Sequence, residues 1–139
     1  MRKKICRCGK VIFDGEICSC KKVKAEKTEE QKEKRREYEK KYRDENKEVV
    51  KPISTAKWQR KREYILHRDA YYCQRCFHKF DIITMENLQV HHIKPRIKYP
   101  HLIYVDSNLI TLCRTCNLHI GTAEELDFDW IAPENDETL

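Results

Sequence analysis

The chain has 139 residues, of which 37% are charged and 40% are hydrophobic. An average protein has about 25% charged residues, so a large enzyme with a deep apolar core is excluded and one small domain with solvated extensions is expected. No apolar run approaches the roughly 18 residues that a membrane span needs. Residues 1–4 lead into cysteines and not into an apolar segment, so we expect no secretory signal and a reducing, cytoplasmic location.

Charge is distributed unevenly along the chain. Lys and Arg outnumber Asp and Glu over residues 1–100, whereas residues 101–139 carry one basic and eight acidic residues. A basic surface is typical of proteins that meet a polyanion. We therefore expect the first hundred residues to face nucleic acid and the acidic C-terminal stretch to lie away from it.

Residues 1–22 are rich in cysteine and are interpreted as a small zinc-ribbon-like hairpin with a turn at Gly15. The cysteines form two CxC pairs: Cys6, Cys8, Cys18 and Cys20. The CxC spacing is less usual for zinc than CxxC. A second structural zinc is expected here, with free thiols as the alternative.

Residues 23–51 are nearly all Glu, Lys and Arg and contain neither Gly nor Pro. Acidic residues precede basic ones at the i,i+4 spacing that supports an exposed helix in three pairs: Glu30/Lys34, Glu37/Lys41 and Glu39/Arg43. The segment lacks a heptad repeat, which excludes a coiled coil. Two interpretations stay open, a solvated helix that acts as a spacer or DNA-contacting arm, and a partly disordered linker.

Residues 52–139 are predicted to form the main domain, which starts with a helix from Thr55 to about His67 and has Ser54 as its N-cap. One side of this helix is expected to face a core: Trp58, Ile65 and Leu66. The other side is expected to face solvent: Lys57, Arg60, Lys61 and Arg68.

Two CxxC pairs follow this helix, separated by 36 residues: Cys73, Cys76, Cys113 and Cys116. Four thiolates give Zn²⁺ a closed tetrahedral shell with no position for water, so the site is expected to be structural. Such a site joins the start of the module to its end. In a domain this small, the zinc site is expected to decide whether the domain folds. The alternative, a redox dithiol, needs only one pair.

Between the CxxC pairs the sequence predicts two strands, Leu88–Ile93 and Asn108–Leu112. Adjacent side chains of a regular strand point to opposite faces. His91 and His92 can therefore share a site only at a strand end or twist, where one binds an ion and the other reaches a water molecule.

The end of the chain is expected to pack around this module. A short helix after Cys116 should end at Gly121. Apolar residues at alternate positions of the tail indicate an edge strand or a segment that lies against the core: Leu126, Phe128 and Trp130.

This order of motifs resembles the HNH endonuclease family and its ββα-metal (His-Me finger) fold, and the small phage-type members in particular. The residues that carry the resemblance are Trp58-Gln-Arg-Lys-Arg62, Arg68-Asp-Ala-Tyr-Tyr-Cys-Gln-Arg-Cys76, Val90-His-His-Ile93, Pro95, Asn108 and Cys113–Asn117. They span about residues 58–117 of the chain. The fold class implied is α+β, a zinc-stapled ββα module with preceding helices and the N-terminal hairpin.

The resemblance implies a role for each matching position. His91 would bind a catalytic divalent metal, and His92 would be the general base. Asn108 would fix the loop between the strands and help to hold the base. Asn117 stands where the family usually has His, as in HNN variants whose amide oxygen binds the ion. A shell of nitrogen and oxygen ligands tolerates Mg²⁺, Mn²⁺ or Ni²⁺.

The activity implied is that of a metal-dependent DNA endonuclease or nickase that leaves 5′-phosphate ends. Histidine, with a pKa of about 6.5, suits the base of such a hydrolysis, and activity should fall as His92 is protonated. Basic side chains are candidates for phosphate contacts, with ordinary solvation as the alternative: Arg60, Arg62, Lys94, Arg96 and Lys98. The resemblance also allows a phage terminase large subunit as partner and the host cytoplasm as location. The rival is a non-catalytic zinc module that binds DNA or a protein.

Overall fold

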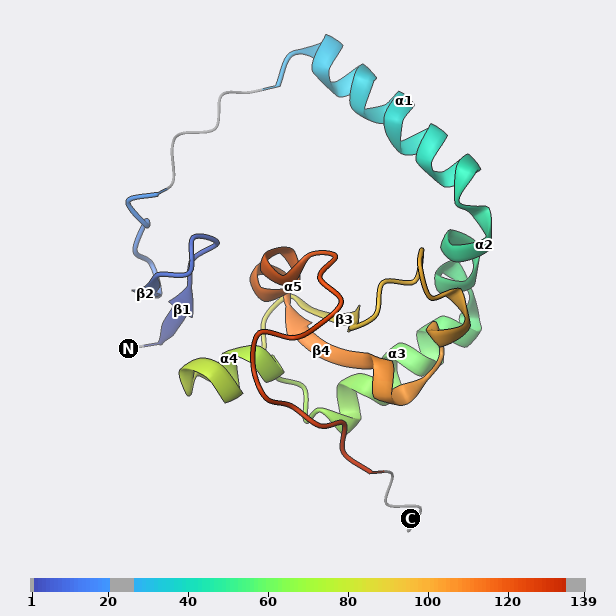
Figure 1. The fold of residues 1–139 in the computed structure, drawn as a ribbon. Coiled ribbons are helices and arrows are strands. Elements are labelled where there is room, and N and C mark those ends of the chain that lie inside the picture. Colours follow the sequence, from blue (N-terminus) through green and yellow to red (C-terminus); the bar gives the residue numbers. More distant parts are fainter. Residues whose placement is uncertain (1, 21–26, 135–139) are drawn as a thin grey trace.

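A two-stranded hairpin, a helical arm and an α+β module follow one another along the chain (Figure 1). The computed structural model describes residues 2–20 and 27–134. The helices and strands are β1 (Lys3–Ile5), β2 (Val11–Phe13), α1 (Glu29–Glu45), α2 (Lys47–Val50), α3 (Ala56–Arg68), α4 (Gln74–Phe80), β3 (Leu88–His92), β4 (Leu109–Cys113) and α5 (Arg114–Ile120). The expected boundary between hairpin and arm, at residues 22 and 23, lies outside the described residues. The predicted α+β class, with a ββα unit and two clusters of four cysteines, is confirmed.

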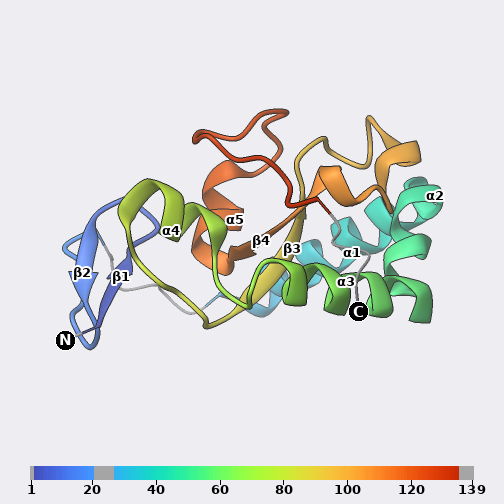
Figure 2. The same ribbon diagram turned by 90° about the horizontal axis from the view of Figure 1, so that it is seen from below.

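The N-terminal hairpin pairs β1 with β2 in antiparallel register. The turn that joins these strands contains Gly9 at φ 88°, and Gly15, at φ 92°, lies in the next turn, after β2. Positive φ favours glycine at both positions, because it has no Cβ. Ile5 is buried and packs into the same core cluster as Cys73 and Ile110, so the hairpin lies against the module beside α4 (Figure 2).

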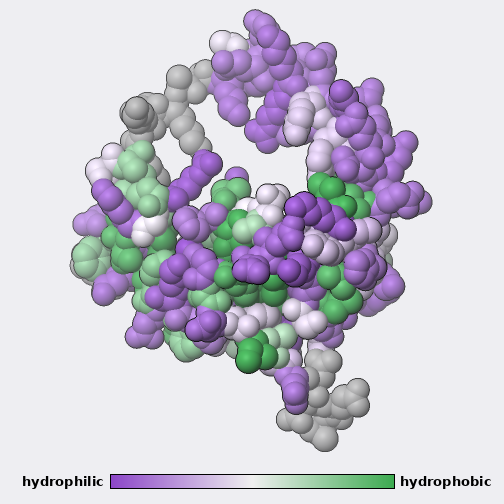
Figure 3. All heavy atoms as spheres, viewed as in Figure 1, coloured by the Kyte–Doolittle hydropathy of each residue, from purple (hydrophilic) through white to green (hydrophobic). Residues whose placement is uncertain are grey.

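Helix α1 is a solvated helix, as one interpretation of the charged segment predicts. Thr28 caps it in a capping box with Gln31, and no α1 residue is buried. Hydrophilic side chains cover it in the space-filling view (Figure 3). Lys34 pairs with Glu30 at 2.6 Å, as expected, but Glu39 pairs with Arg35, on its N-terminal side.

Helix α3 packs against β3 and β4, and its residues Trp58, Ile65 and Leu66 are buried as predicted. The N-cap prediction is wrong by one residue. Thr55 caps the helix by accepting a hydrogen bond from the backbone N–H of Trp58, whereas Ser54 ends a 3-10 turn (η1, Lys51–Ser54). Because this turn extends to Ser54, the helix starts one residue later than expected.

The prediction that Arg68 faces solvent is also wrong. Its side chain is 6% exposed and pairs with Asp69 at 2.8 Å. It donates as well to the backbone oxygens of Asp106 and Leu109. Five N–H donors allow arginine to hold several acceptors at once, so Arg68 ties the end of α3 to the start of β4.

Strands β3 and β4 pair antiparallel, with His91 opposite Ile110 and His92 opposite Leu109. All five residues of β4 are buried, because α3, α4 and α5 each contact this strand. Asn108 lies in a 3-10 turn that precedes β4. The prediction that Asn108 belongs to the strand is therefore wrong.

Helix α5 completes the ββα unit and ends at Gly121 as expected. It begins at Arg114, before Cys116, since Cys113 is its N-cap. The tail forms no strand among the described residues; instead its apolar side chains pack against the core, the second of the two expected arrangements: Leu126, Phe128 and Trp130. Of the described helices, none has the length and apolarity to cross a membrane.

Candidate metal and nuclease site

The buried four-cysteine cluster joins both ends of the ββα module. The ligand atoms of Cys73, Cys76, Cys113 and Cys116 lie within 4.8 Å of one another, and all four residues are buried. Cys73 and Cys113 are the N-caps of α4 and α5, and each thiol accepts the backbone N–H of the second cysteine in its pair. This grouping matches the predicted tetrahedral sulfur site.

A buried arginine lies next to this cluster. The Arg75 guanidinium is 3.5 Å from the Cys116 sulfur and pairs with the Asp127 carboxylate at 2.7 Å. The ion pair with Arg75 holds the pKa of Asp127 well below its usual value. A fixed positive charge at this distance stabilises thiolates.

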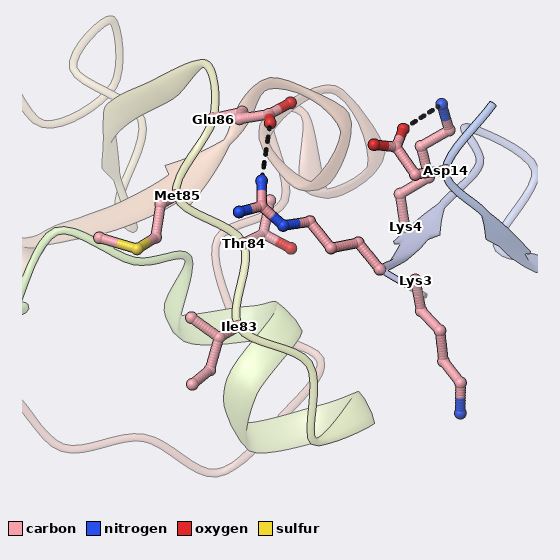
Figure 4. A pocket seen from close by; sticks show the side chains of 8 residues that line it. Lys3, Lys4, Asp14, Ile83, Thr84, Met85 and Glu86 are labelled. Atoms are coloured by element: carbon pink, nitrogen blue, oxygen red, sulfur yellow. Dashed lines mark hydrogen bonds and ion pairs between the residues drawn. The ribbon is translucent and has the colours of Figure 1, made fainter.

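The N-terminal four-cysteine cluster is more open. Its ligand atoms also lie within 4.8 Å of one another, but Cys8 and Cys20 are exposed while Cys6 and Cys18 are buried. A hollow of about 320 Å³ lies between the hairpin and residues 83–86. Figure 4 shows Lys3, Lys4 and Asp14 of the hairpin on one side of this hollow and residues 83–86 on the other. Arg2 pairs with Glu86 at 3.9 Å.

The two residues that the resemblance implies as catalytic-metal ligands meet between β3 and α5. His91 Nδ1 lies 2.7 Å from Asn117 Oδ1. Asn117 follows Cys116 on α5, so the buried four-cysteine cluster places it opposite β3. His91 is 8% exposed, and its Nε2 atom is buried without a hydrogen-bond partner among the described residues. Burial lowers the pKa of His91 below 6.5, against the opposing effect of the Asn117 contact.

His92, at the end of β3, is held on two sides. Its ring stacks on Trp58, with centroids 5.1 Å apart and planes 17° from parallel, and its Nε2 atom lies 3.1 Å from the Ile103 carbonyl oxygen. A carbonyl oxygen only accepts, so Nε2 carries the proton and Nδ1 keeps a lone pair. Burial lowers the pKa of His92 to about 4; the charge of Arg96 acts in the same direction, and the bond to Ile103 opposes it.

Asn108 holds the long loop that connects β3 to β4. Its side-chain oxygen accepts the backbone N–H of Lys94 at 2.7 Å, and its side-chain nitrogen donates to the backbone oxygens of Lys94 and Leu102. Because Ile103 follows Leu102 in this loop, Asn108 lies one step from the carbonyl that orients His92.

His91, His92 and Asn117 line one hollow of about 300 Å³. Arg96 also lines it and donates a hydrogen bond to the Val49 carbonyl at 3.2 Å. The arm contributes Tyr42 to the same wall. The two adjacent histidines thus line the same hollow at the C-terminal end of β3.

The other basic candidates lie outside the described lining of this hollow. Lys98 pairs with Glu124, and Lys94 Nζ lies 5.9 Å from the centroid of the Tyr99 ring. Arg62 donates to the Leu88 carbonyl at 3.2 Å, whereas Arg60 is exposed. Of the five residues, Arg96 is the one that the structure brings to the histidines.

Sequence reasoning missed two residues at the site. Gln89 accepts a hydrogen bond from the Asn117 amide at 2.5 Å, and Tyr42 reaches the hollow from α1. Gln89 has a usable signal, because residues i and i+2 of a strand share a face and Gln89 precedes His91 by two. Tyr42 has no such signal, because the sequence of α1 does not indicate how this helix packs beside the module.

Comparisons with known proteins show the family to which the chain belongs. A family model described as HNH endonuclease matches residues 73–123. The crystal structure of the HNH endonuclease of the deep-sea thermophilic bacteriophage GVE2, with a manganese ion, is 32% identical in sequence, with 59% of this chain and 85% of that chain covered and a TM-score of 0.49. None of the curated proteins matches the chain. The family model and the sequence identity confirm the resemblance, and the chain belongs to the HNH endonuclease family.

Proposed function

We propose that the chain is a metal-dependent DNA endonuclease or nickase, with its nuclease domain in residues 52–139. The observation that carries the proposal is the shared hollow in which His91, Asn117 and an oriented His92 meet Arg96. Phosphodiester hydrolysis needs a base for water and positive charge near the phosphate. A module that only binds DNA needs neither an oriented imidazole nor paired nitrogen and oxygen donors.

The donors of His91 and Asn117 fit a catalytic divalent ion. His91 Nδ1 and Asn117 Oδ1 lie 2.7 Å apart and would together hold the ion once Nδ1 gives up the proton that it donates to the amide oxygen. The lowered pKa keeps His91 neutral, the form that binds metal. When bound, Mg²⁺, Mn²⁺ or Ni²⁺ would supply positive charge to the phosphate and the leaving oxygen. The manganese ion in the phage relative supports Mn²⁺ as the first ion to test.

His92 would take the proton from the attacking water through Nδ1. Its Nε2 proton is donated to Ile103, and the Trp58 ring holds the imidazole plane. The lowered pKa keeps the ring unprotonated at neutral pH. A phosphate bound beside Arg96 would raise that pKa, because a nearby negative charge favours the protonated form, and would thus make His92 a stronger base.

The remaining assignments follow the same proposal. Arg96 would bind the scissile phosphate, and flanking phosphates would meet the other basic candidates: Arg60, Arg62, Lys94 and Lys98. Asn108 would hold the loop that carries Ile103. Both four-cysteine clusters would bind structural Zn²⁺, since four thiolates complete its preferred shell.

Cleavage of supercoiled plasmid DNA tests the proposal. The zinc-loaded full chain should nick or linearise the plasmid in Mn²⁺ or Mg²⁺, and His92→Ala should lose about 10²–10⁴-fold in rate, the usual contribution of a general base. His119→Ala is the matched control, because His119 is exposed on α5 and lies outside the described lining of the hollow.

Each outcome of this assay has a definite meaning. If wild type leaves the plasmid intact in Mg²⁺, Mn²⁺ and Ni²⁺, the endonuclease is rejected and the non-catalytic binding module is favoured. Equal cleavage by wild type and a folded His92→Ala variant would remove His92 as the base.

A further inference from the structure

A metal ligand of the asparagine type carries an ambiguity that an aspartate ligand lacks. The amide ends in one oxygen, which can bind a cation, and one NH₂ group, which cannot. Rotation of the amide by half a turn exchanges these two groups with almost no change in shape. A site that uses Asn117 therefore needs a neighbour that makes one orientation preferred.

Gln89 is placed to do this. Its Oε1 atom accepts a hydrogen bond from Asn117 Nδ2 at 2.5 Å, and Asn117 Oδ1 then faces His91 Nδ1 at 2.7 Å. Gln89 and His91 point to the same face of β3, since they are two residues apart on the strand. The contact is half-buried, so loss of the partner would leave a poorly solvated amide.

We propose that Gln89 is a positioning residue that fixes the orientation of the Asn117 amide and so directs its oxygen toward the metal position next to His91. This inference rests on the proposed metal site. It gives Gln89 no contact with the ion or the DNA. It also gives a reason for a polar side chain at a half-buried strand position.

The chemistry of the contact predicts how substitutions behave. Gln89→Glu keeps an acceptor opposite Asn117 Nδ2 and should preserve the orientation. Gln89→Leu removes the acceptor but keeps a similar size, so the amide can turn and present NH₂ to the ion. Asn117→Asp has two equivalent oxygens, so it presents an oxygen to the ion in either orientation.

Mn²⁺ binding to the zinc-loaded full chain, measured without DNA by the EPR signal of free Mn²⁺, tests the proposal. The relevant binding component is the one that His91→Ala abolishes. Gln89→Leu should weaken that component by about 10–100-fold, as is typical when a partner of a metal ligand is removed. Gln89→Glu should bind at least as tightly as wild type, and the double variant Gln89→Leu/Asn117→Asp should recover the lost affinity.

Control variants separate orientation from damage to the fold. Gln59→Leu makes the same substitution at an exposed position of α3 and should leave Mn²⁺ binding unchanged. A purely structural role of Gln89 predicts equal losses from Gln89→Leu in the Asn117 and the Asn117→Asp backgrounds. That equality, or unchanged binding by Gln89→Leu, would overturn the inference while leaving the metal site intact. Absence of any His91-dependent binding in wild type would instead overturn the proposed metal site itself.

Discussion

The two four-cysteine clusters have the same donors in opposite surroundings. In the module all four cysteines are buried and belong to a core that includes Ile110 and Leu112. In the hairpin two of the four are exposed, and the strands beside them have three residues each. The comparison shows that a set of four cysteines does not by itself define a role: one cluster lies inside the core of the module, while the other lies in a small hairpin that packs against it.

The spacing of the cysteines accounts for much of this difference. In each CxxC pair the first cysteine caps a helix and accepts the backbone N–H of the second, so that the pair starts α4 or α5. The CxC pairs are too short for that arrangement, and a helix follows neither of them within the described residues. Because α5 carries Asn117 directly after Cys116, the buried cluster is coupled to the proposed nuclease site, whereas no residue of the hairpin cluster adjoins a proposed ligand of that site.

The largest effect is expected from Cys116→Ser. This change removes one ligand of the proposed structural zinc between α4 and α5, and such sites can supply most of the folding free energy of a small domain. The zinc content should fall from two ions to one per chain, the cooperative thermal transition of the module should disappear, and plasmid cleavage should be lost. Metal analysis and near-ultraviolet circular dichroism check this. A folded variant that still cleaves DNA would show that the buried cluster is not essential.

An intermediate effect is expected from Asp127→Asn, which alters the surroundings of the buried cluster without touching its ligands. It leaves the Arg75 guanidinium, 4% exposed, without its carboxylate. Breaking a buried ion pair costs about 3–5 kcal/mol. We expect about 3 kcal/mol at the low end of that range, because Asp127 is 35% exposed and solvent screens the pair.

The pH dependence of this loss has a definite sign. The folded-state pKa of Asp127 is lowered, so its stabilising effect is complete above the unfolded pKa of about 3.9 and is lost only as the pH falls further. The difference in Tm between wild type and Asp127→Asn should therefore stay constant from pH 8 to pH 5. Asp129→Asn, an exposed change two residues away, is the control. A difference that shrinks within this range would place the titration elsewhere.

The sequence predicts those parts of the molecule that depend on ligand chemistry and local periodicity. The buried four-cysteine site, the buried face of α3 and the end of α5 at Gly121 are all local or spacing-dependent features. The burial of Arg68 could not be predicted, because its acceptors on Asp106 and Leu109 lie about forty residues away. The N-cap prediction failed for a different, local reason: Ser54 ends a 3-10 turn of residues 51–54, which leaves Thr55 to cap the helix.

The candidate site also has features that the sequence predicts and features that it does not. The resemblance identifies His91, His92 and Asn117 as candidates, yet it does not indicate what orients them. Ile103 and Trp58 hold His92 through contacts that arise only when the loop and α3 pack against β3. Orientation thus depends on tertiary contacts, whereas the identity of the reactive groups depends on residue type.

The smallest effect on the module is expected from Cys18→Ser, which makes the same substitution as Cys116→Ser in the other cluster. Zinc content should again fall by one ion, but the module should keep its thermal transition and its plasmid cleavage. The hairpin contacts the module through an exposed ion pair, with Arg2 and Glu86 86% and 77% exposed, and through buried Ile5. The first contributes little, and loss of the second sets an upper bound of about 1.5–3 kcal/mol. If Cys18→Ser unfolds the module as Cys116→Ser does, the two clusters form one cooperative unit and the contrast between them fails.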